Sequence, residues 1–199
     1  MKYDNEPLLV AQSREELRSW LITNSTVERA CWVSVSITPQ PRTLLYLDAV
    51  EEALCFGWID GIKKKLHDGV LSQRLSPRAP GSSWTELNKE RVRRLQRLGL
   101  MRDEGRRVLP DLGEASFQID PGIEQALRED REVYENFMAF PALYRRVRID
   151  TIQSAKKQLE VFRSRLEKLI ACTKANKLYG QWNDGGRLLP ALEPWERFC

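Results

Sequence analysis

The spacing of apolar and polar residues predicts helices and strands in turn along the first part of the chain. Ser13 and Glu16 have the spacing of a capping box, and apolar residues follow them at helical intervals as far as Asn24. Residues 30–37 alternate and are rich in β-formers, which indicates a strand. A second helix is expected over residues 44–56.

A β-hairpin is predicted for residues 58–77. Asp68-Gly69 is a two-residue turn signal between two extended runs, and a loop made of these residues pairs Ile62 with Leu75. Because side chains alternate across a strand, one face of the hairpin should lie in the core and the other should be basic. On this register we expect Ile62, Leu66, Leu71 and Leu75 to be buried, and Lys63, Lys65 and Arg74 to be exposed.

Helices dominate the remainder of the chain. Residues 83–86 have the spacing of a second capping box, with Ser83 as the cap, and open a helix that should stop at Gly99. Asp120-Pro121 supplies the N-cap and first residue of a further helix. One long helix is expected over residues 143–175, because apolar residues recur there at steps of three, four and seven.

The predicted fold class is therefore α+β, with a small antiparallel sheet (the strand plus the β-hairpin) covered by helices and a helical C-terminal part. The expected divisions are an α+β domain at residues 1–109, a loop or linker at 110–122, a helical module at 123–175 and an irregular tail at 176–199. The tail is expected either to be irregular throughout or to dock through Trp182 and Trp195.

The composition is that of an ordinary globular protein, with 42% hydrophobic residues in 199. No apolar run is long enough to cross a bilayer, so no transmembrane segment is expected. The chain opens without the apolar run or cleavage site of a secretory signal, and we therefore expect a cytoplasmic protein. The cysteines form no close pair, and Cys31 and Cys55 are expected to be small core residues.

The motifs predict no metal and no cofactor. Carboxylate pairs such as Glu51-Glu52 are interpreted as the surface charge of helices rather than as metal ligands. The chain has no P-loop and no dinucleotide-binding glycine motif. The single histidine, His67, lies beside the predicted turn and is interpreted as a solvated residue rather than a catalytic base.

Positive charge is concentrated in the middle of the chain. The net charge is only +4, but residues 61–110 hold 13 Lys and Arg against 5 Asp and Glu. Basic patches bind phosphate-rich partners by counterion release. No standard nucleic-acid motif accompanies this one, and acidic residues dilute it, so a solvated charged face is the favoured interpretation. The candidate anion or nucleic-acid contacts are Lys63, Lys65, Arg74, Arg93 and Arg97.

Two tryptophans, a carboxylate, an amide and a guanidinium fall in or just after the predicted hairpin. Together they suit a pocket for a small polar or anionic ligand. The alternative is structural: Asp60 lies on the apolar face, where it should be largely buried, and Arg78 follows the strand end opposite it and should neutralise it, with Lys64 as the second choice. The structural interpretation is favoured. The candidate pocket residues are Trp58, Asp60, Arg78, Trp84 and Asn88.

Residues 49–61 read AVEEALCFGWIDG, a run rich in Trp, Cys and Gly. This run resembles the signature of the YdeI/OmpD-associated (bacteriocin-protection) family, and the resemblance extends over most of residues 13–175. The chain departs from the family pattern at residues 158–163, which read QLEVFR where the family has a Glu-Thr-Arg run. The resemblance implies a bacterial protein linked to envelope stress or to tolerance of bacteriocins and antimicrobial peptides, with no established reaction. A more distant similarity is to small frataxin-like iron chaperones.

These observations favour a non-catalytic binding protein whose partner is a small anionic ligand or another protein, with the oligomeric state left open. Two other classes remain. One is an enzyme that acts on a small polar or anionic ligand held by Trp58, Asp60, Arg78 and Trp84. The other is a nucleic-acid-binding protein that uses the basic residues of 61–110.

Overall fold

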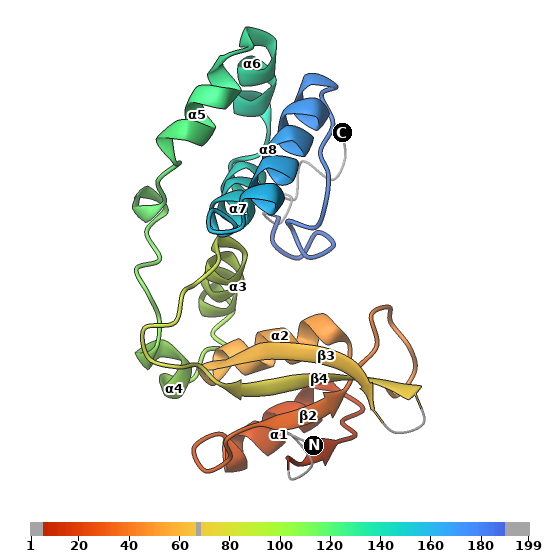
Figure 1. Cartoon of the computed structure of the whole chain (residues 1–199). Coiled ribbons are helices and arrows are strands. Elements are labelled where there is room, and N and C mark those ends of the chain that lie inside the picture. The colour runs from red at the N-terminus through yellow and green to blue at the C-terminus, as the bar shows by residue number, and fades with distance from the viewer. Residues whose placement is uncertain (1–5, 67–68, 190–199) are drawn as a thin grey trace, which may run out of the picture. The chain divides into compact units, whose positions relative to one another are not determined.

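The computed structural model describes residues 6–66 and 69–189 (Figure 1). These residues form two compact units. The first holds the described residues of Met1–Ser83 and Arg91–Pro110, and the second holds those of Trp84–Glu90 and Asp111–Cys199. The predicted helical module, residues 123–175, therefore lies within the second unit.

The first unit is built on a sheet. In the described residues it has four strands, β1 (Leu8–Leu9), β2 (Cys31–Ser34), β3 (Trp58–Leu66) and β4 (Val70–Pro77), in the order β1-β2-β4-β3. The α+β class is confirmed. The sheet is mixed rather than purely antiparallel, because β1 runs parallel to β2 while the other neighbours are antiparallel. A strand of two residues is too short for periodicity to predict.

Two helices, α1 (Arg14–Asn24) and α2 (Tyr46–Cys55), pack against each other and against the sheet (Figure 1). The predicted cap of α1 is confirmed, since the Ser13 side chain accepts a hydrogen bond from the Glu16 amide at 3.3 Å. Burial of apolar side chains on both helices supplies the core of this unit. The fully or almost fully buried members are Leu17, Leu21, Val50 and Leu54.

The register of the hairpin differs from the prediction. Asp60 pairs with Leu75, and a β-bulge lies between Asp60 and Lys63. The predicted pairing of Ile62 with Leu75 is therefore wrong, and Ile62 is 47% exposed while Leu75 is fully buried. The Gln73 side-chain amide donates to the carbonyl oxygens of Ile62 at 3.3 Å and of the preceding glycine at 3.0 Å. These bonds satisfy backbone groups that a bulge takes out of the ladder.

The bulge also divides the predicted basic face. Lys63 pairs with Gln73, so these two side chains share a face and the neighbouring Arg74 points to the other one. Lys63 and Lys65 are exposed as predicted, whereas Arg74 is half-buried. The prediction that all three form one basic face is therefore wrong. Leu66 and Leu71, which we expected to be buried, are half-buried.

The turn of the hairpin falls partly outside the described residues, which exclude His67 and Asp68. Leu66 pairs with Val70, so the loop is one residue longer than the predicted two-residue turn. Gly69 has a φ of +78°, a conformation that glycine adopts without steric cost.

Two helices follow the hairpin, α3 (Glu86–Arg97) and α4 (Asp103–Arg107). Thr85 rather than Ser83 caps α3, because its hydroxyl accepts from the Asn88 amide at 3.2 Å. The predicted stop is confirmed, with Gly99 at a φ of +68° just after the helix. Helix α4 packs against the C-terminal end of α2, and the contact requires a glycine. A Cβ at Gly105 would lie 2.2 Å from the Cys55 carbonyl oxygen.

The second unit is helical. The predicted cap Asp120 is confirmed, since its side chain accepts from the Gly122 and Ile123 amides. The Asp130 side chain accepts a hydrogen bond from the Glu132 amide at 3.0 Å and caps a helix that the sequence does not predict separately. The elements are the short 3₁₀ helix η2 (Glu114–Ser116), α5 (Pro121–Arg128), α6 (Arg131–Ala139), α7 (Ala142–Gln153) and α8 (Leu159–Lys174).

The predicted single helix over residues 143–175 is wrong, because turns at residues 154–158 separate α7 from α8. These five residues contain neither Pro nor Gly, and the apolar spacing continues across them, so periodicity alone shows no break. The two helices pack against each other instead of forming one rod.

The core of the second unit gathers around Tyr144. This fully buried ring packs edge-on against Phe140 at 5.4 Å and against Trp182 at 5.7 Å between ring centroids. The described part of the predicted tail thus docks through Trp182, and Leu188 is buried too. Trp195 lies outside the described residues.

We expect Gly105→Ala to destabilise the first unit by about 2 kcal/mol or more, because its Cβ would overlap a backbone oxygen that cannot move aside without displacing α2. Gly61→Ala is the control, since the nearest atom to a Cβ there is 3.7 Å away. Chemical denaturation measures both. Equal free energies of unfolding for the two variants would contradict the close approach of α4 to α2.

Candidate functional site

Two adjacent acids on α2, Glu51 and Glu52, are buried, with 1% and 0% of their surface exposed. The interpretation of this pair as surface charge is therefore wrong. Neighbouring helical residues point in different directions, so burying both requires α2 to be covered on more than one side. A buried carboxylate is stable only when cations or several donors meet it.

Arg14 meets both acids. Its Nε donates to Glu52 at 2.5 Å, its Nη1 donates to Glu51 at 2.6 Å, and the same Nη1 lies 3.8 Å from an Asp48 carboxylate oxygen. Burial on its own lowers the pKa of Arg14, but the charges of Glu52 and Glu51 outweigh it and raise that pKa above its ordinary value. Arg14 is therefore a fixed cation.

Two further arginines complete the α2 ion network, by which we mean Arg14, Arg18, Glu51, Glu52 and Arg94. Arg18 donates to Glu52 at 2.8 Å and to the Leu100 carbonyl oxygen at 2.7 Å. Arg94 of α3 donates to Glu51 at 2.8 Å. Each of the four carboxylate oxygens thus accepts a hydrogen bond from one of these arginines. The three arginine side chains are 22% to 26% exposed.

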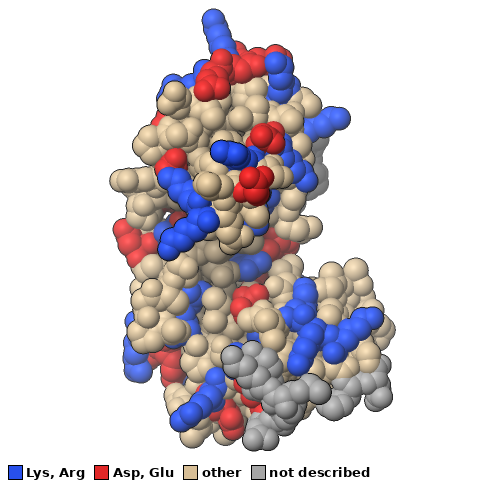
Figure 2. Space-filling model, in the orientation of Figure 1, with Lys and Arg blue, Asp and Glu red and all other residues tan. Residues whose placement is uncertain are grey.

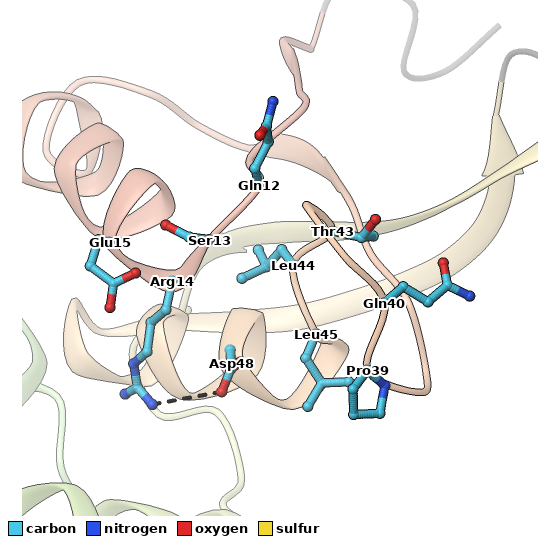
Figure 3. A pocket seen from close by; sticks show the side chains of 10 residues that line it. All are labelled: Gln12, Ser13, Arg14, Glu15, Pro39, Gln40, Thr43, Leu44, Leu45 and Asp48. Atoms are coloured by element: carbon cyan, nitrogen blue, oxygen red, sulfur yellow. Dashed lines mark ion pairs between the residues drawn. The ribbon is translucent and has the colours of Figure 1, made fainter.

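A pocket of about 410 Å³ lies beside this network (Figure 3). It is bounded by the start of α1, the loop over residues 39–45 and the start of α2. Arg14 belongs both to the network and to the pocket wall, and its Nη2 is buried with no hydrogen-bond partner among the described residues. The polar groups in the lining are those of Gln12, Ser13, Arg14, Glu15, Gln40, Thr43 and Asp48.

The structure places Trp58 in the core of the first unit. The side chain is 1% exposed, and its indole nitrogen donates to the Ser25 carbonyl oxygen at 3.1 Å. The ring packs edge-on against Trp20 with 6.1 Å between centroids. These contacts anchor the start of β3 to α1.

Asp60 is half-buried rather than largely buried. Its carboxylate accepts a hydrogen bond from the Tyr46 hydroxyl at 2.8 Å, and Lys63 lies over the Tyr46 ring at 4.3 Å. Lys64 lies over the Trp32 ring at 4.8 Å. The hydroxyl of Tyr46 is thus the donor that meets this carboxylate, a partner that no motif in the sequence indicates.

Arg78 is 6% exposed and donates to the Ser83 carbonyl oxygen at 2.8 Å and to the Ser82 hydroxyl at 3.2 Å. Burial lowers the pKa of Arg78, and the negative charge of Asp60 partly offsets that effect. The predicted position of Asp60 opposite Pro77 is wrong, since the register pairs Pro77 with Trp58.

Trp84 and Asn88 belong to the second unit, whereas Trp58, Asp60 and Arg78 belong to the first. None of the five lines the pocket beside the α2 ion network. Their role as a ligand pocket stays a prediction.

The basic candidates do not share one surface. Lys63 and Lys65 lie on the Gln73 face of the hairpin, and Arg74, on the other face, is paired with Glu6 at 2.6 Å. Arg93 is half-buried and Arg97 exposed on α3. Figure 2 shows basic side chains gathered near the outer end of the hairpin and interspersed with acidic ones elsewhere on the visible face.

The buried cysteines are core residues, as predicted. Burial raises the pKa of Cys31 and of Cys55 to about 12 each, so both thiols are protonated at neutral pH. Among the described residues, no group of three or more His, Cys, Asp and Glu side chains has the arrangement of a metal site. No helix in the described ranges combines the length and apolar character needed to cross a membrane.

Removing one acid of the network tests its part in stability. We expect Glu52→Gln to destabilise the protein by about 3–5 kcal/mol, because the change removes the buried negative charge that Arg18 pairs with and one of the two buried carboxylates that hold Arg14. Glu15→Gln on the exposed side of α1 is the matched control and should leave the free energy of unfolding close to that of the wild type. Chemical denaturation measures both, and a Glu52→Gln variant as stable as the control would contradict the network.

Two family models match the chain. One, described as a domain of unknown function (DUF8412), matches residues 9–108. The other, described as "Bacteriocin-protection, YdeI or OmpD-Associated" (OmdA), matches residues 116–176. No curated protein and no solved structure matches.

The two matches correspond to different parts of the chain. The YdeI/OmpD-associated resemblance is confirmed by the second match, while the run at residues 49–61 that suggested it, together with the α2 ion network, lies within the first. The first match covers half of the chain. The chain therefore belongs to the DUF8412 family and carries a YdeI/OmpD-associated module in its C-terminal unit.

Proposed function

We propose that the protein is a non-catalytic binding protein that contributes to tolerance of bacteriocins or other antimicrobial peptides. Its ligand site is the pocket beside the α2 ion network, in the unit that the DUF8412 match covers. The link to tolerance rests on the description of the family that matches residues 116–176.

The polar lining of the pocket carries the proposal. At about 410 Å³ the pocket falls within the size range of small-molecule sites. Its wall presents amides from Gln12 and Gln40, hydroxyls from Ser13 and Thr43, and charges of both signs. Because Arg14 is accompanied by carboxylates, including Asp48, the lining suits a polar ligand with several hydroxyl or amide groups better than a strongly anionic one.

The ion network gives this pocket a preorganised wall. Arg14 is held by two buried carboxylates, so it loses little conformational freedom when a ligand arrives. Its Nη2 is buried and has no hydrogen-bond acceptor among the described residues.

The chemistry of the surrounding groups supports binding more than catalysis. Every oxygen of Glu51 and Glu52 accepts a hydrogen bond from an arginine, and neither acid lines the pocket, so neither is placed to act on a bound ligand. The thiol of Cys55, on the same helix, is held protonated and is a poor nucleophile.

A ligand screen by thermal denaturation tests the site, with a panel of monosaccharides, amino acids and nucleosides. A ligand at one hundred times its Kd should stabilise the wild type by about 2.7 kcal/mol. Gln40→Trp, which fills the pocket from an exposed loop, should abolish the stabilisation. Gln96→Trp, at an exposed position on α3, is the control and should respond like the wild type. Equal responses of both variants would place the ligand elsewhere, and no response from any compound would count against the pocket.

Tolerance is tested separately in cells. Production of the chain in a bacteriocin-sensitive bacterium should raise the concentration of peptide that kills half of the cells. The Gln40→Trp variant should lose this protection and Gln96→Trp should keep it. Unchanged killing curves with the wild type would reject the role in tolerance while leaving the binding result intact.

A further inference from the structure

A second pocket, of about 240 Å³, lies in the C-terminal unit. It is formed by η2 and the segment that follows it, by α6 and by the start of α7. Its volume is below the range of drug-sized sites, so it suits a smaller molecule. One part of the lining is apolar and consists of Phe117, Ile119, Phe137 and Ala142. The other part is charged and consists of Arg145, Arg146 and Glu114.

The charge of Arg146 is already balanced. Its guanidinium lies 2.7 Å from a Glu114 carboxylate oxygen, 3.4 Å from one of Glu90 and 3.6 Å from one of Glu86. Lys89 also pairs with Glu86, at 2.9 Å, so the carboxylates of this cluster share at least two cations. Glu114 itself lines the pocket and places a negative charge in this part of its wall. This side of the pocket therefore disfavours a ligand with two negative charges.

The adjacent Arg145 is in the opposite situation. Its Nη1 donates to the Met138 sulfur at 3.1 Å, and a thioether is a weak acceptor. Its Nε is buried and has no acceptor among the described residues. The guanidinium thus lacks the partner that a half-buried cation ordinarily has.

We propose that this pocket binds a small monocarboxylate that bears an apolar or aromatic group. The apolar group lies against Phe117 and Phe137, and the carboxylate pairs with Arg145. A carboxylate matches the planar fork of a guanidinium, and a single negative charge tolerates the acids around Arg146.

Two kinds of molecule supply a carboxylate beside an apolar group: a free aromatic or branched acid, and a peptide through its C-terminal residue. The inference goes beyond the proposed function, because it concerns another pocket in the other unit. All of the lining residues except Glu114 fall within the match at residues 116–176, so the site belongs to the YdeI/OmpD-associated module.

Titration calorimetry on the full chain tests the site with sodium phenylacetate as the probe. Phenylacetamide, which has the same shape without the charge, should bind at least ten times more weakly. Arg145→Gln should reduce the affinity for phenylacetate at least tenfold. Arg163→Gln, at an exposed arginine of α8 away from the pocket lining, is the matched control and should not change it.

Ala142→Phe provides a second variant that keeps Arg145 and fills the pocket from an exposed position. It should block phenylacetate while leaving the melting temperature close to that of the wild type. A peptide that ends in Phe and its amidated form distinguish the sources: tighter binding of the free-acid peptide than of phenylacetate indicates a chain terminus, and the reverse order indicates a free acid. Equal affinities for phenylacetate and phenylacetamide, full affinity in Arg145→Gln, or no binding of any probe would overturn the proposal.

Discussion

The first unit depends on the pairing of Arg14 with two buried carboxylates on α2. Glu51 and Glu52 have almost no exposed surface, and an unpaired carboxylate in that setting costs several kcal/mol. The arginines of α1 and α3 must therefore be in place whenever α2 is covered. Ionic networks of this kind are often replaceable by apolar residues without loss of stability. Their effect here is to define which segments surround α2 and in which orientation, because this arrangement gives each of the four carboxylate oxygens an arginine donor.

The same pairing shapes the pocket in Figure 3. Arg14 is the first residue of α1 and Asp48 lies in the first turn of α2, so a contact between their side chains brings the starts of the two helices together. The loop over residues 39–45 closes the remaining side. The pocket therefore results from the pairing of Arg14 with the acids of α2. Any change that loosens the α2 ion network alters the pocket wall as well.

Features that depend on residues close in sequence were predictable, and features that depend on distant ones were not. Ser13 and Asp120 cap their helices through amides two or three residues away, so a short motif suffices. The partners of Glu52 lie 34 and 38 residues from it, and nothing in the run at 49–61 reports them. The available signal was the spacing of Arg14 and Arg18, which places both cations on one side of α1, together with two adjacent acids among the apolar residues of α2. The hairpin register failed for the same reason, since the bulge is held by a Gln73 side chain from the other strand.

The two adjacent arginines of α7 show how sequence position alone misleads about charge. Consecutive helical residues point roughly 100° apart, so Arg146 reaches the acids while Arg145 points to a thioether and the apolar pocket. A count of charges along the sequence treats them as equivalent. In the structure one is neutralised and the other retains its attraction for an anion. The acids that neutralise Arg146 also limit that attraction to ligands of low charge, because each added negative charge meets their repulsion across a short distance. Selectivity for a monoanion therefore follows from the neighbour of the binding residue rather than from the binding residue itself.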